Sequence, residues 1–152
     1  MRGHRRAGAP DHGPTRAHWV LLVLSVLAPL VVLSLGALLD PDPRGHGTHE
    51  QLGIPPCAAM FLYGIPCPGC GVTTAVTLVG EGSIASAFLV QPFGALLALG
   101  SFVAGAFALW AAVRGRDLGV LLLTRSPLLP ALLVGGALIG AWAYRVALAL
   151  AP

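Results

Sequence analysis

The stretch WVLLVLSVLAPLVVLSLGALL, residues 19–39, decides the fold class of this chain, because it contains no charged residue. About 20 consecutive apolar residues form a helix long enough to cross the hydrocarbon core of a bilayer. Pro29 lies inside the stretch, and spanning helices tolerate proline. A cleaved signal peptide has a shorter apolar region of roughly 7–15 residues and a small-residue cleavage site, which this stretch lacks. The stretch therefore predicts an uncleaved membrane anchor.

Two more apolar runs of spanning length follow, at about 93–113 and 128–150. The whole chain is 56% hydrophobic and 10% charged, whereas about a quarter of the residues of a soluble domain are charged. We therefore expect an all-α integral membrane protein with about three transmembrane helices, forming one domain over residues 19–152 with the lipid bilayer as its main partner. Between the first two spans, a short interfacial helical segment is expected to carry a Cys-x-x-Cys turn.

The arginines beside the spans predict the orientation, since positively charged flanks stay on the cytoplasmic side. The tail over residues 1–18, expected to be disordered, carries Arg2, Arg5, Arg6 and Arg16, and the segment 114–127 carries Arg114, Arg116 and Arg125. The long 40–86 loop carries Arg44 alone. The protein is therefore predicted to be multi-pass in the inner or plasma membrane, with the N-terminus cytoplasmic and the loop extracytoplasmic. A basic cluster next to a span sets orientation, so no nucleic-acid partner is expected.

Arg145 lies inside the last apolar run. A charge at the centre of a bilayer costs at least about 2.5 kcal/mol on insertion scales. Two explanations are open: the side chain reaches the headgroups at the outer end of its helix, or it pairs with an acid on the same side, such as Glu81.

Three cysteines, Cys57, Cys67 and Cys70, lie close together in the loop. In an oxidising compartment the simplest hypothesis is a structural disulfide from Cys57 to Cys67 or Cys70. A second hypothesis is a zinc or iron site of all three thiolates, with His46 or His49 as a further ligand. A third is thiol–disulfide exchange by Cys67 and Cys70, which precede a short helix predicted at 72–79 whose dipole would favour a thiolate.

No other catalytic pattern accompanies the cysteines, and no βαβ pattern of a thioredoxin fold surrounds them. Thr74 is expected to make a local hydrogen bond on the short helix, and Glu81 to be a solvated turn residue. We expect no resident cofactor, with zinc or iron as the alternative. The catalytic candidates are Cys67 and Cys70, and enzymatic activity is not favoured.

An ordered set of residues in this region resembles a bacterial membrane family, domain of unknown function 2752. The set comprises Pro56-Cys57, Tyr63-Gly64-Ile65-Pro66-Cys67-Pro68-Gly69-Cys70-Gly71-Val72-Thr73-Thr74-Ala75, Gly80-Glu81, Ala87 and Gln91-Pro92-Phe93. Thr74 stands where the family usually has Arg, Glu81 where it has Asp, and Gln91 where it has Asn. Threonine lacks the charge and the five donors of arginine. If the family's site uses that arginine to hold an acid or an anion, this member would lack the activity unless Arg145 replaces it.

These features predict a multi-pass membrane protein with a structured extracytoplasmic cysteine loop that docks a partner, either another membrane protein or a second copy of the chain. One alternative is a membrane thiol oxidoreductase or metal-binding protein that uses the Cys-Pro-Gly-Cys turn. Another is an accessory subunit of a transport or secretion complex. A transporter acting alone is disfavoured because few charged groups lie within the spans.

Overall fold

The computed structural model describes residues 14–123 and 128–150, and every regular element in this part of the chain is a helix. In chain order the elements are α1 (Arg16–Leu38), the 3₁₀ helix η1 (Thr48–Leu52), α2 (Ala58–Tyr63), α3 (Val72–Gly80), α4 (Ile84–Val90), α5 (Pro92–Val113), α6 (Leu118–Leu123) and α7 (Leu128–Leu150). The predicted all-α class is therefore confirmed.

Three of these helices, α1, α5 and α7, are long and apolar enough to cross a membrane. They coincide with the three predicted spans, with small differences at two starts. Helix α1 begins at Arg16 rather than Trp19, because the hydroxyl of Thr15 accepts the His18 N–H at 3.2 Å and caps the helix there. Helix α5 begins at Pro92, a residue suited to the first helical position because its missing N–H has no partner there anyway.

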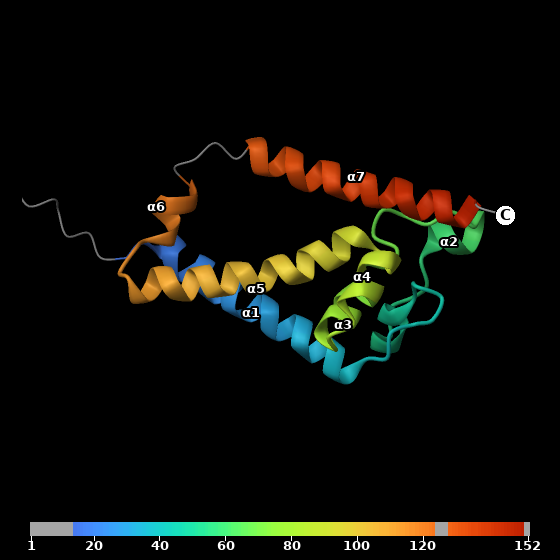
Figure 1. Ribbon diagram of the computed structural model, residues 1–152, viewed down its shortest axis with the longest axis horizontal. Coiled ribbons are helices and arrows are strands. Elements are labelled where there is room, and N and C mark those ends of the chain that lie inside the picture. The colour runs from blue at the N-terminus through green and yellow to red at the C-terminus, as the bar shows by residue number, and fades with distance from the viewer. Residues whose placement is uncertain (1–13, 124–127, 151–152) are drawn as a thin grey trace, which may run out of the picture.

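Helix α3 packs against both α1 and α5 at the end of the bundle where α1 ends and α5 begins (Figure 1). Its side chains are buried from Thr74 to Val79, and they pack against Val32 of α1 and against Ala95 and Ala98 of α5. The sequence predicts a short helix over nearly these residues, as part of an extracytoplasmic loop. In the structure, α3 lies beside the last turns of α1 and closes the core.

Glycine allows α1 and α3 to approach each other closely. A Cβ atom at Gly36 would lie 2.6 Å from the Cα atom of Gly80, and a Cβ at Gly80 would overlap the carbonyl oxygen of Val32. Small residues also line the buried face of α5, as they do where membrane helices pack tightly. They are Gly94, Ala95, Ala98, Gly105, Ala108 and Ala111.

Helix α7 is attached to the rest of the bundle mainly near its C-terminal end. The Trp142 indole donates to the Pro66 carbonyl at 2.8 Å, and the Tyr144 hydroxyl donates to the Leu89 carbonyl at 2.8 Å. Figure 1 shows α7 running along α5, with its C-terminal end beside α2. The loop that bears the cysteines is thus fastened to the third long helix.

At the opposite end, the start of α1 is tied to α6. Asp117 accepts the Thr15 backbone N–H at 2.7 Å, and His18 Nδ1 accepts the Leu118 N–H at 3.1 Å. Residues 118–123, predicted as an apolar part of a loop, form a short helix instead, because Asp117 accepts the Val120 N–H and caps it. Arg2, Arg5, Arg6 and Arg125 lie outside the described residues.

Candidate functional site

The Cys-Pro-Gly-Cys-Gly segment forms a tight turn that leads directly into α3. The Cys70 N–H donates to the Cys67 carbonyl at 3.0 Å, and the Val72 N–H donates to the Gly69 carbonyl at 3.1 Å. Gly71 has φ +88°, and a Cβ atom there would lie 2.7 Å from the Gly45 carbonyl oxygen. Glycine is therefore required at this position both for the backbone conformation and for the space.

A buried glutamine holds this turn against the start of α5. Gln91 is fully buried; its Oε1 accepts the Gly94 N–H at 2.8 Å and its Nε2 donates to the Pro68 carbonyl at 3.4 Å. One amide side chain therefore caps α5 and fixes the middle of the cysteine turn. The sequence indicates Gln91 only as a substitute for the family's asparagine, because its contact with Pro68 joins positions that are far apart in the sequence.

The three thiols converge at this turn. The Sγ atoms of Cys57, Cys67 and Cys70 all lie within 4.8 Å of one another, and the Cys67 and Cys70 sulfurs are 3.3 Å apart. Cys57 arrives from a separate segment, at the position that precedes α2. All three are free thiols in the structure, so the structural disulfide stays a prediction.

The environments of Cys57 and Cys70 shift their pKa values in opposite directions. The pKa of Cys57 is lowered to about 7, chiefly because the Met60 backbone N–H in the first turn of α2 stabilises the thiolate. Burial, together with the neighbouring Cys67 and Cys57 thiols, raises the pKa of Cys70 to about 12. Cys57 is therefore the readier nucleophile of these two, which was not expected from the sequence because the helix at 58–63 was not predicted there.

A cavity of about 120 Å³ adjoins the thiol cluster and includes both candidate histidines in its wall. Its lining consists of Arg44, His46, His49, Glu50, Pro56, Cys57, Met60, Phe61 and Cys70. His46 Nδ1 lies 3.0 Å from the Arg44 carbonyl oxygen, so this nitrogen is the donor in the neutral ring and Nε2 is left as the one able to bind a ligand. Cys57, Cys70, His46 and His49, which the sequence offered as candidate metal ligands, therefore all line one cavity.

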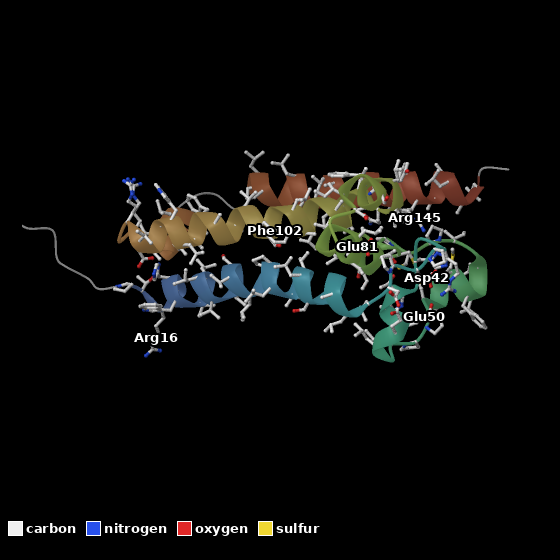
Figure 2. All side chains as sticks on the ribbon, turned by 60° about the horizontal axis from the view of Figure 1, so that its bottom comes forward. Arg16, Asp42, Glu50, Glu81, Phe102 and Arg145 are labelled. Carbon is white, nitrogen blue, oxygen red and sulfur yellow. The ribbon has the colours of Figure 1, made fainter. Side chains whose placement is uncertain are left out.

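Charged residues of the 40–52 segment hold the wall of this cavity in place. Arg44 Nη2 lies 2.7 Å from Asp42 Oδ2 and 3.2 Å from Glu50 Oε2. The hydrogen bond from Arg44 lowers the pKa of Asp42 below its usual value. Figure 2 shows Asp42, Glu50 and Arg145 together at one end of the molecule, opposite Arg16.

The other candidate residues from the sequence occupy different places. Thr74 is buried, with its hydroxyl 2.9 Å from that of Thr48, so it fixes η1 to α3. Glu81 is exposed at the C-terminal end of α3, away from the cysteine turn that precedes this helix. Arg145 donates from Nη1 to the Val90 carbonyl at 3.2 Å, and no ion pair with Glu81 occurs in residues 14–123 and 128–150.

Fold and site together define the class as an all-α protein with three helices of membrane-spanning length and a convergent three-thiol cluster. The family model described as "Protein of unknown function (DUF2752)" matches residues 57–111, so the family resemblance of the sequence is confirmed for this part of the chain. The matched part begins at Cys57 and extends almost to the end of α5. Neither a curated protein nor a solved structure matches the chain.

Proposed function

We propose that this chain is a three-span membrane protein that binds a thiophilic metal ion of the zinc class on its extracytoplasmic side, with Cys57, Cys67 and Cys70 as ligands. The observation that carries the proposal is the convergence of three thiols from two separate segments within 4.8 Å. Thiolate sulfur is a preferred ligand of zinc, and three cysteines with one further ligand form a common site.

The sulfur separations suit a tetrahedral ion. A Zn–S bond of about 2.3 Å sets the edge between two sulfurs of a tetrahedron at roughly 3.8 Å. The separations here run from 3.3 Å to at most 4.8 Å, so shifts of about 1 Å or less would bring the three sulfurs to that edge. A bound cation would also offset the burial that disfavours the Cys70 thiolate.

A fourth ligand is available from the adjoining cavity, which His46 and His49 line. Histidine is the usual completion of a three-cysteine site. His46 is the better candidate of the two, because the contact of its Nδ1 with the Arg44 carbonyl already fixes the ring.

The distribution of charge supports an extracytoplasmic side for the thiol cluster. Arg114 and Arg116 follow α5 at the end of the bundle where α1 begins, whereas the thiol cluster lies at the other end. Arginine-rich flanks favour the cytoplasm, so the cluster is proposed to face outward.

Metal analysis of the purified full chain tests this function. Protein isolated under reducing conditions with zinc present should carry an equimolar amount of metal, and Cys67→Ser and Cys57→Ser should each lose most of it. Met60→Leu is the matched control, because it alters the wall of the same cavity without removing a thiol. Equal metal content in wild type and Cys67→Ser, or none in wild type, would refute the proposal.

Thiol–disulfide exchange is the second candidate, favoured by the lowered pKa of Cys57. The Cys57 thiolate would attack a disulfide of a partner protein and release one partner thiolate. Cys67 or Cys70 would then displace the second partner sulfur, which leaves a disulfide in this chain and two thiols in the partner. The double variant Cys67→Ala/Cys70→Ala should accumulate the mixed disulfide at Cys57, and a clean absence of any trapped partner would count against exchange.

A further inference from the structure

A second cavity, of about 210 Å³, shares Arg44, His46 and Met60 with the cavity that adjoins the thiol cluster. Its lining contains three nitrogen-bearing side chains and no acid. The residues around it are Arg44, His46, Met60, Pro66, Arg145, Leu148 and Ala149. This cavity is therefore positive in character on one side and apolar on the other.

Arg145 enters this cavity with most of its hydrogen-bonding capacity unused. Its Nη1 donates to the Val90 carbonyl at 3.2 Å, while its Nε is buried and has no hydrogen-bond partner. A guanidinium carries five N–H donors and a fixed positive charge. The side chain as a whole is half-buried, and a charge that is partly withdrawn from water without a counter-charge favours binding of an anion.

Nearby acids do not supply that anion. Asp42 and Glu50 both pair with Arg44, and neither lines the second cavity. In the part of the chain that the structure describes, no ion pair involves Arg145.

Gly45 keeps the guanidinium accessible. A Cβ atom at this position would lie 3.3 Å from Arg145 Nη1 and 3.8 Å from Nη2, and the glycine has φ +72°. Any larger residue would cover the face of the guanidinium fork and would also strain the backbone.

We propose that this cavity binds the oxyanion of a phosphate group, with Arg145 as the main ligand. A guanidinium fork matches two phosphate oxygens. Such a group comes either from a lipid headgroup or from free phosphate. The apolar wall of Leu148 and Ala149 lies at the end of a helix of spanning length, where headgroups are found, so a lipid can run its chain along α7.

Binding measurements on the full chain in detergent test this site. Native mass spectrometry would follow retention of phosphatidylglycerol, and the unfolding temperature would follow titration with inorganic phosphate against chloride. Arg145→Gln should weaken phosphate-group binding about tenfold or more, which corresponds to the loss of one charged hydrogen bond. Gly45→Ala should weaken it with Arg145 still present. Arg114→Gln is the control and should leave binding unchanged, because Arg114 follows α5 at the opposite end of the bundle from the C-terminal end of α7.

The two measurements distinguish a lipid headgroup from free phosphate as the bound group. Retention of phosphatidylglycerol that depends on Arg145, without an effect of inorganic phosphate, supports a lipid headgroup. Stabilisation by inorganic phosphate that Arg145→Gln abolishes supports the free ion. Equal binding by wild type and both site variants overturns the proposal. Metal content is measured separately, so failure here is distinct from failure of the thiol site.

Discussion

Replacing Gly36 by alanine tests whether the close approach of α1 and α3 holds the bundle together. The added Cβ atom would lie 2.6 Å from Gly80 Cα and 2.5 Å from the Glu81 nitrogen, both of them backbone atoms that cannot rotate away. Ordinary van der Waals contact begins at 3.4 Å. The two helices would therefore have to separate by roughly 0.9 Å or more, and overpacking of this kind typically costs about 1–3 kcal/mol.

A matched control removes the effect of helix propensity. A Cβ atom added at Gly100 in α5 would meet no other atom within 4 Å, so Gly100→Ala changes propensity without a clash. Alanine favours a helix interior by about 1 kcal/mol over glycine, and both variants share this gain. The difference between them therefore isolates the cost of the helix contact.

Tryptophan fluorescence during heating of the detergent-solubilised protein gives the comparison. For a chain of this length about 1 kcal/mol corresponds to roughly 2–4 °C in Tm, so Gly36→Ala should unfold several degrees below Gly100→Ala. Equal unfolding temperatures for the two variants would refute the assigned packing of α3 against α1.

Three further predictions concern the thiols, the buried amide and an acidic cap. At pH 7 iodoacetamide should alkylate Cys57 well before Cys70, as followed by peptide mass spectrometry, because their pKa values are about 7 and about 12. Gln91→Leu should lower the free energy of unfolding by about 1–2 kcal/mol in thermal melts, because the α5 cap is lost. The Thr15 N–H lowers the pKa of Asp117, so its stabilisation is complete above the ordinary value of 3.8 and is lost as pH falls through the lower folded value. Melts at several pH values should show less acid sensitivity in Asp117→Asn.

Clear results would contradict each of these. Faster alkylation of Cys70 would mean that its thiol is not buried, and an unchanged melt of Gln91→Leu would mean that its two hydrogen bonds do not stabilise the fold. Identical acid profiles of wild type and Asp117→Asn would mean that the carboxylate cap adds no stability.

Sequence patterns could predict the long helices but not how the loop packs. In a membrane, an uncharged apolar run such as 19–39 can satisfy its backbone hydrogen bonds within the segment only as a helix. The length of the run is therefore enough to predict a spanning helix. The packing of α3 against α1 depends instead on the contact of Gly36 with Gly80, and nothing local in the sequence indicates which two glycines meet.

In the cysteine site, too, the local turn could be predicted from the sequence but the contacts between distant segments could not. The Cys67–Cys70 turn is local, and its place ahead of α3 was predicted correctly, because the run from Val72 to Val79 that follows it ends at glycines. That Cys57 lies beside it depends on the path of residues 58–66, which a single sequence does not determine. The hydrogen bond from Arg145 to the Val90 carbonyl could not be predicted either, because the two residues belong to different helices. Partner docking by the loop stays a prediction.

The indole of Trp142 and the amide of Gln91 hold two backbone carbonyls of the cysteine turn, at Pro66 and Pro68. These carbonyls lie on either side of Cys67, and the two side chains belong to different parts of the helix bundle. A change in the tilt of α7 would therefore pull on one flank of the thiol while α5 held the other. The distances between the sulfurs, and with them any affinity for an ion, would therefore depend on the tilt of α7 relative to α5.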